Sequence, residues 1–186
     1  MNRANKNILI ISSIILIIII WSILLYYIKP SEIVEAIGIN NGYLITFLVA
    51  LFAGASAITS TTYYATIITF SLGDLNPILL ALMVGPALVI GDSIFFFIGY
   101  KISKIARGQL KEKMNKFSKW IITRKKWFVP FVIYFYSGFT PFPTDILMIS
   151  LSVAKYPFKK VIIPLLLGNI TLAFIIGTLA IWLQTF

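Results

Sequence analysis

Five apolar stretches follow one another along the chain, and two of them are interrupted by polar or helix-breaking residues. Three have about the length of one membrane-spanning helix, which needs about 20 residues: 8–28, 75–100 and 161–186. The stretch 42–73 is broken by AGASAITSTT (53–62), and the stretch 127–154 is broken by SGFTPFPTD (137–145). Neither interrupted stretch fits one continuous helix, so the pattern predicts two helical hairpins and three single spans.

The composition places these helices in a membrane. Hydrophobic residues make up 59% of the 186 residues, and the mean hydropathy is +0.95. This is too apolar for a soluble domain, which must present a polar face to water. The stretch 8–28 is longer than the core of a signal peptide and has no small-residue cleavage site behind it, so an uncleaved first span is expected.

Lysine and arginine are concentrated in one segment, which predicts how the chain is oriented. Ten of the sixteen lie between Lys101 and Lys126, within a formal net charge of +10. In a membrane chain such a cluster marks a cytoplasmic loop, so no nucleic-acid partner is expected. If the N-terminus is cytoplasmic and both hairpins are re-entrant, fifteen of the sixteen basic residues are cytoplasmic and Lys29 is the exception. Two short spans in 42–73 would keep the same sidedness.

The basic segment 101–126 also carries apolar residues at near-helical spacing. It is expected to form a cytoplasmic amphipathic linker on the inner leaflet, where its cations attract anionic lipid at roughly 1 kcal/mol per charge. Arg124, Lys125 and Lys126 lie at the end of this linker. Topological positivity alone explains the same composition equally well.

The residue types that are absent exclude several kinds of chemistry. The sequence has no cysteine and no histidine, which removes thiol nucleophiles, disulfides, imidazole bases and the usual zinc or haem ligands. We therefore expect no enzymatic activity, no metal and no cofactor. Any chemistry rests on carboxylates and hydroxyls.

Asp145 is the only charged residue among the 28 residues of 127–154. Pro141 and Pro143 predict a turn just before it, followed by a helix with Thr144 at its N-cap and Asp145 in its first turn. A carboxylate at a helix N-terminus stabilises the helix by a few tenths to about 1 kcal/mol. Insertion of a carboxylate at the centre of a bilayer costs about 2.5–3.5 kcal/mol. This imbalance favours a functional role over a purely structural one.

Asp92 is the second acid within an apolar stretch. Gly85 and Gly99 lie two helical turns before and after it, on a face where another helix could approach closely. Asn169 lies on a comparable stripe of the last span. Two interpretations have equal weight: a hydrogen bond between the two polar stripes, or a contact that binds a proton or a polar headgroup.

A run of hydroxyl residues, which includes Thr61 and Thr62, is expected to begin the returning half of the first hairpin. If both hairpins point their returning helices at mid-membrane, two helix N-termini face a common centre, which suits an anion such as phosphate. Asp145 would repel an anion unless it is protonated, which indicates proton linkage or a cationic partner.

The two halves of the chain resemble each other. The segments 71–99 and 150–177 both carry Ser-Leu, two prolines, a Gly-Asp or Gly-Asn pair and a final glycine. With the orientation above, the copies enter the membrane from opposite sides. This arrangement is the inverted repeat of many transporters, whose substrate site lies near mid-membrane. The predicted fold class is an all-α polytopic membrane protein built on such a repeat, with an additional N-terminal span.

Two segments resemble the DedA family, also called the VTT-domain or SNARE-associated Golgi protein family. They are GPALVIGDSIFFFIGYK (85–101) and TPFPTDILMISLSVAKYPFKKVIIPLLLGN (140–169). The resemblance implies a lipid transporter of the prokaryotic plasma membrane that moves polyprenyl phosphate or phospholipid with proton coupling. Asp145 and Asp92 match positions where the family commonly carries polar or acidic residues.

The chain departs from the family pattern at two places. The first hairpin offers Thr61 or Thr62 where the family often has an acid, and Ser137 and Gly138 stand where it usually has an arginine. These departures leave room for another lipid or for a purely scrambling mode. Besides a flippase or scramblase, we consider a small-ion or solute transporter and a non-transporting adaptor that binds its partner through the basic linker. The oligomeric state is not predicted.

Overall fold

The computed structural model describes residues 30–53, 60–105, 112, 115–116, 119, 123–124, 127–142 and 144–184. Within these residues the regular structure is entirely helical, as predicted. The helices are α2 (Pro30–Ile37), α3 (Ile39–Ala53), α4 (Ser60–Leu72), α5 (Pro77–Ile105), α7 (Phe128–Phe139), α8 (Asp145–Val153) and α9 (Phe158–Gln184). The predicted first span, 8–28, lies outside the described residues.

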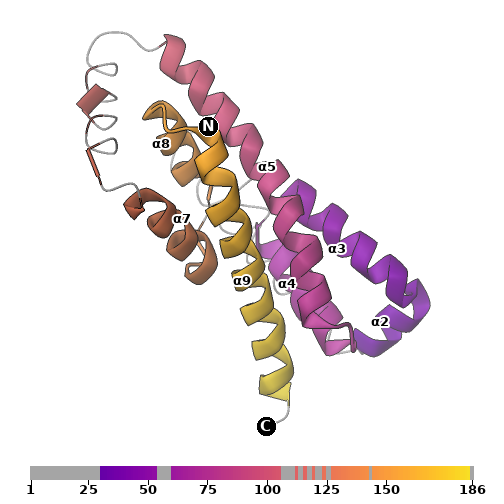
Figure 1. Ribbon diagram of the computed structural model, residues 1–186. Helices are drawn as coiled ribbons and strands as arrows, with labels where there is room; N and C mark the ends of the chain where they lie inside the picture. Colours follow the sequence, from indigo (N-terminus) through magenta and orange to yellow (C-terminus); the bar gives the residue numbers. More distant parts are fainter. Residues whose placement is uncertain are drawn as a thin grey trace, which may run out of the picture.

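Two long helices, α5 and α9, form the axis of the molecule. They pack against each other and run in opposite directions (Figure 1). Their 29 and 27 residues correspond to about 40 Å of helix each, which exceeds the roughly 30 Å hydrocarbon core of a bilayer. Only 50% and 33% of their most apolar segments are buried. Both helices are therefore long and apolar enough to cross a membrane, with much of their surface available to lipid.

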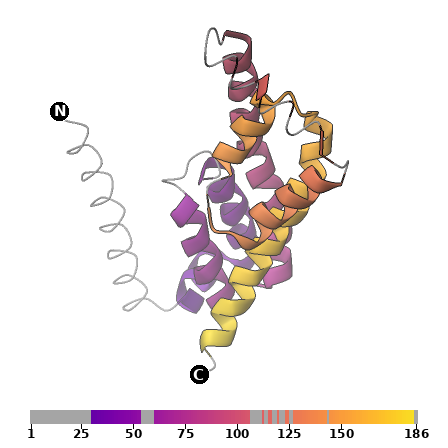
Figure 2. The ribbon, with the colours of Figure 1, turned by 90° about the vertical axis from the view of Figure 1, so that its left-hand side faces the viewer.

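The shorter helices form two pairs, and the members of each pair contact different long helices. α3 packs on α5 and α4 packs on α9, whereas α7 packs on α9 and α8 packs on α5. In Figures 1 and 2, α4 lies towards the end where α5 begins, and α8 lies towards the end where α9 begins. α4 and α8 thus each end close to the start of the next long helix.

The turns that join α4 to α5 and α8 to α9 have the same backbone conformation. Asp74 and Lys155 are both left-handed, with φ of 67° and 59°. The next amide in each turn, that of Leu75 or Tyr156, donates at 3.0 Å to the carbonyl of the residue five positions earlier. This hydrogen bond is that of a Schellman motif, which usually places glycine at the left-handed position.

A glycine of each long helix permits close contact with the helix that ends at one of these turns. A Cβ added to Gly99 of α5 would lie 2.9 Å from the carbonyl oxygen of Ile149 in α8. A Cβ added to Gly177 of α9 would lie 2.7 Å from Oγ of Ser71 in α4. These contacts bring the ends of α4 and α8 against the opposite long helix.

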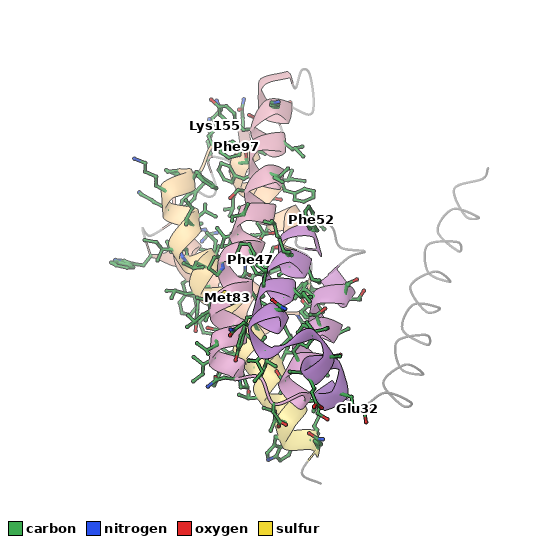
Figure 3. The ribbon with its side chains drawn as sticks, turned by 90° about the vertical axis from the view of Figure 1, so that its right-hand side faces the viewer. Glu32, Phe47, Phe52, Met83, Phe97 and Lys155 are labelled. Atoms are coloured by element: carbon green, nitrogen blue, oxygen red, sulfur yellow. The ribbon has the colours of Figure 1, made fainter. Side chains whose placement is uncertain are left out.

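The outer surface is apolar along the bundle and charged at its ends (Figure 3). Phe52, Met83 and Phe97 are 73%, 40% and 53% exposed. We call one end the basic end, for its exposed lysines Lys101, Lys155, Lys159 and Lys160, and the other the acidic end, for Glu32, Glu35 and Asp74. A broad apolar surface between charged ends is what a protein embedded in a bilayer presents to lipid.

Candidate functional site

Asp92 lies near the midpoint of α5 and is 1% exposed. Nδ2 of Asn169, in α9, donates a hydrogen bond to its Oδ2 at 3.3 Å. Oγ1 of Thr144, just before α8, donates to its Oδ1 at 2.5 Å. The hydrogen bond between Asp92 and Asn169, one of the two interpretations of the sequence, is therefore present. Thr144 adds a second hydrogen bond to the same carboxyl group. Buried polar groups are stabilised only when they are partnered in this way.

Thr144 occupies the N-cap position of α8, as predicted, but its side chain does not cap the helix. Its backbone is already helical, with φ −75° and ψ −16°, whereas a capping residue usually adopts an extended conformation. The hydroxyl donates to Asp92. A hydroxyl can donate one hydrogen bond and accept another, so the missing cap follows from the helical backbone of Thr144 and not from its contact with Asp92.

Asp145 is the first residue of α8 and is half-buried. It lies close enough to Asp92 for the two carboxyl groups to interact electrostatically. Two like charges repel strongly where the dielectric constant is low. The structure thus brings together the two acids that are 53 positions apart in the sequence.

The turn before Asp145 is described only in part. Pro141 and Phe142 are exposed, and Oγ1 of Thr140 donates to the carbonyl of Tyr136 at 2.5 Å, at the end of α7. Pro143 lies outside the described residues. α7 ends at Phe139 and α8 begins at Asp145, so the helix is interrupted where the sequence predicted it.

The hydroxyl run lies in the first turn of α4, where the sequence predicted it. Thr61 is half-buried and Thr62 is exposed. The next two residues, Tyr63 and Tyr64, both interact electrostatically with Asp92. Tyr63 is 5% exposed, and the two rings lie 4.1 Å apart between centroids. The sequence analysis missed both tyrosines, although their place directly after the hydroxyl run could have indicated them.

α7 and α9 cross closely at the positions where the family resemblance suggests an arginine. Ser137 is buried and its Oγ donates to the carbonyl of Ile133 at 2.8 Å. A Cβ on Gly138 would lie 3.2 Å from Cα of Gly168. This crossing leaves little room for a larger side chain at position 138.

Part of the basic linker is described. Arg124 is exposed, and its Cζ lies 5.7 Å from the centroid of the Phe128 ring. Lys116 and Glu112 form an exposed salt bridge at 2.9 Å, with the spacing of one helical turn. Lys125 and Lys126 lie outside the described residues.

Three buried hydroxyl oxygens have no hydrogen-bond partner in the described part of the chain: those of Thr69, Ser71 and Ser152. Ser71 and Ser152 occupy the same position in the two Schellman motifs, three residues before the left-handed residue. The described residues contain no group of acids that could hold a metal ion.

Comparison of the chain with protein-family models, with curated proteins and with solved structures gave no match.

Proposed function

We propose that the protein is a multi-pass membrane lipid translocase of the flippase or scramblase type and a divergent member of the DedA family. The observation that carries the proposal is the polar cluster at the middle of α5, formed by Asp92, Asn169, Thr144 and Asp145. An acid at this depth in a bilayer is costly and is typical of proton relays and substrate pathways. Transport without enzymatic catalysis suits a chain without cysteine or histidine.

The helix contacts support an inverted repeat. The first helix of each hairpin packs on the long helix of its own half, and the second packs on that of the other half. The long helices run in opposite directions, and each follows the same Schellman turn. A two-fold axis in the membrane plane would produce this pattern. The proposed orientation places the basic end in the cytoplasm, as the positive-inside rule requires.

The two turns also offer a register for comparing the halves. Counted back from Asp74 and Lys155, Tyr63 and Tyr64 take the places of Thr144 and Asp145. Counted forward, Asp92 corresponds to Ala173, one helical turn from the Asn169 that the sequence alignment paired with it. Tyr63 and Ala173 belong to the same buried apolar cluster. In this register the polar contact of one half is an apolar contact in the other.

The proposed mechanism uses this asymmetry. The headgroup moves past the cluster while the hydrocarbon chains stay in the surrounding lipid. The N-terminus of α8 offers backbone amides to a phosphate, and Asp145, being half-buried, exchanges a proton as the anion passes. Asp92 keeps α8 in place through Thr144. An anionic group is accepted most readily when Asp145 is neutral, so transport is coupled to protons.

The test is movement of fluorescent lipid by the purified full-length protein in liposomes, with and without a pH gradient. Asp145→Asn is expected to abolish flipping or to make it independent of the gradient, because asparagine retains the shape but not the proton. Asp74→Asn, at the exposed turn, is the matched control and should behave as wild type. Wild-type flipping with normal pH dependence in Asp145→Asn would end this assignment.

The same liposomes separate the alternatives. Flux of ions or small solutes without lipid movement would indicate a solute transporter. If neither lipid nor solute moves and the basic linker binds a partner with Asp92→Asn and Asp145→Asn as well as with wild type, the protein is an adaptor. Impermeant labelling of cysteines placed at positions 62 and 145 gives an independent check. Ready labelling of both from water would place the hairpin ends at the boundary and contradict a site at mid-membrane.

A further inference from the structure

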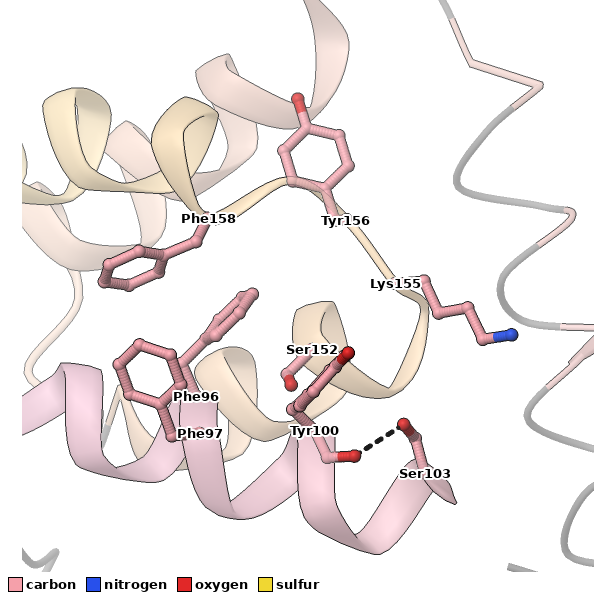
Figure 4. Close-up of a pocket in the computed structure, with 8 residues that line it drawn as sticks. All are labelled: Phe96, Phe97, Tyr100, Ser103, Ser152, Lys155, Tyr156 and Phe158. Atoms are coloured by element: carbon pink, nitrogen blue, oxygen red, sulfur yellow. Dashed lines mark hydrogen bonds between the residues drawn. The ribbon is translucent and has the colours of Figure 1, made fainter.

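A pocket of about 620 Å³ lies at the basic end, and its lining on α5 begins at Phe96, one helical turn beyond Asp92. It is formed by the last turns of α5, the end of α8 and the turn into α9 (Figure 4). Its lining residues are Phe96, Phe97, Tyr100, Ser103, Ser152, Lys155, Tyr156 and Phe158. The volume is within the roughly 300–1,000 Å³ range of pockets that bind small ligands.

One side of the pocket is aromatic. The ring of Phe158 lies 4.9 Å from that of Phe96 and 5.3 Å from that of Phe97, measured between centroids. Phe97 is 53% exposed on the outer surface of α5. An apolar chain in the surrounding lipid can therefore contact this side of the pocket without leaving the membrane.

The other side is polar and carries a positive charge. Lys155 is exposed and makes no salt bridge with any described residue. Oγ of Ser152 is buried and has no hydrogen-bond partner in the described structure. The eight lining residues include no acid, so the lysine is not neutralised within the pocket. This combination favours a ligand with a negative charge and hydrogen-bond acceptors.

The position of the pocket matches the headgroup level of a leaflet. Tyr100 and Tyr156 flank it, and Lys101, Lys159 and Lys160 are exposed at the same end. Tyrosine and lysine gather at the interface between hydrocarbon and water. A lipid in that leaflet would present its phosphate at the depth of Lys155 and its chains at the depth of the phenylalanines.

We infer that this pocket binds one phosphate-bearing lipid, with the phosphate at Lys155 and the hydrocarbon chain against Phe97 and Phe158. The inference builds on the proposed translocase and names the site where lipid enters or leaves its cytoplasmic side. Phosphate and a long chain are shared by polyprenyl phosphates and anionic glycerophospholipids. The experiment below distinguishes these two sources.

The test is photolabelling of the full-length protein in phosphatidylcholine nanodiscs with a phosphatidic acid that carries a diazirine on its chain. Label is expected in the peptides around residues 96–103 and 152–158. Lys155→Asn should reduce it about fivefold, as expected from the roughly 1 kcal/mol of one interfacial charge. Asparagine tolerates the left-handed backbone of this position, so the turn should be kept. Lys159→Gln removes a charge of the same end outside the pocket lining and should leave labelling unchanged.

Competition identifies the source of the phosphate. Unlabelled polyprenyl phosphate that displaces the probe more strongly than phosphatidylglycerol would assign the pocket to the former, and the reverse order to the latter. Absence of label in these peptides, or equal labelling of Lys155→Asn and wild type, would overturn the inference. Photolabelling does not require translocation. If Asp145→Asn does not flip lipid but is labelled normally, the lipid-binding pocket stands and the proposed transport mechanism is tested separately. If wild type flips lipid but is not labelled, the pocket is refuted and the proposed translocase is not.

Discussion

The two turns that lead into the long helices share a backbone but differ in chemistry. Asp74 and Lys155 both adopt the left-handed conformation, and both follow a buried serine hydroxyl that has no hydrogen-bond partner among the described residues. One turn is acidic and the other is basic, and the pocket described above lies at the basic one. The conformation of a turn is therefore compatible with opposite charges, and the charges distinguish the two ends of the molecule.

The starts of α4 and α8 also differ in chemistry. Thr144, before α8, donates to Asp92 of α5. Tyr63, in α4, packs in an apolar cluster that includes Ala173 of α9. Similar helix crossings thus hold a polar contact in one half and an apolar contact in the other.

The largest effect is expected from labelling of the two turns, because accessibility from one side is all or none. The natural sequence contains no cysteine, so Asp74→Cys and Lys155→Cys each introduce a single reactive thiol. An impermeant maleimide added to intact cells should modify position 74 alone, and position 155 should react only after permeabilisation. Labelling of both positions from the same side would contradict the inverted arrangement.

The second-largest effect is expected at Gly99 and Gly177, where an added methyl group would disturb close helix packing. In Gly99→Ala the new methyl group meets the backbone of Ile149, 2.9 Å from its carbonyl oxygen. Since backbone cannot rotate away, we expect a loss of about 1–3 kcal/mol in the free energy of unfolding. In Gly177→Ala it meets the Ser71 hydroxyl, which can rotate, so the loss should be smaller.

Unfolding in mixed detergent micelles measures both losses. Adding Ser71→Ala to Gly177→Ala should recover part of the loss, because it removes the nearest atom but leaves Cβ of Pro77 at 3.2 Å. If Gly177→Ala proves as destabilising as Gly99→Ala and Ser71→Ala does not rescue it, the two crossings are tighter and more alike than the distances indicate.

A smaller difference is expected between the starts of α4 and α8. Thr144→Val removes one of the two donors to Asp92 and should lower the free energy of unfolding by about 1–2 kcal/mol, because Asn169 still donates. Tyr63→Phe, in the apolar half, should lower it by about 1 kcal/mol or less. Thr144→Ser keeps the hydroxyl and is the control, measured by the same denaturation. Equal losses in Thr144→Val and Thr144→Ser would show that the methyl group of threonine, and not its hydroxyl, stabilises this contact.

The smallest effect concerns the left-handed residues. Lys155→Gly should raise the free energy of unfolding by about 0.5–1 kcal/mol, because glycine adopts this conformation without strain but loses more entropy on folding. Asp74→Gly should gain less, since aspartate tolerates the conformation better than lysine does. Thermal unfolding of the two variants beside wild type measures this. A larger gain at Asp74 would reverse the ranking and show that other contacts hold Lys155.

Several elements could be predicted from the sequence because they depend on neighbouring residues. The interruption at SGFTPFPTD separates α7 from α8, and the hydroxyl run begins α4. The clustering of lysine and arginine predicted that one end of the molecule is basic. α2 was not predicted, because Pro30–Ile37 lies between two apolar stretches and is too short and polar for a span, although it forms a helix with Gly38 at its end.

Other features depended on how the helices cross. From the sequence, Asp145 was the main candidate, whereas the structure places Asp92 at the centre, with Asp145 half-buried beside it. The sequence predicted a capping role for Thr144, which donates to Asp92 instead. The tyrosines near Asp92 and the pocket at Lys155 bring together side chains from separate helices, which no local pattern shows.

The sequence by itself determined the helical class, the places where the apolar stretches break and the acids that lie within them. These follow from hydropathy, proline and the spacing of side chains along one helix. Only the tertiary structure decided which residues meet, since the hydrogen bonds to Asp92 join positions 52 and 77 residues apart. A shift of one turn in a helix crossing leaves the local pattern unchanged but exchanges every partner across it.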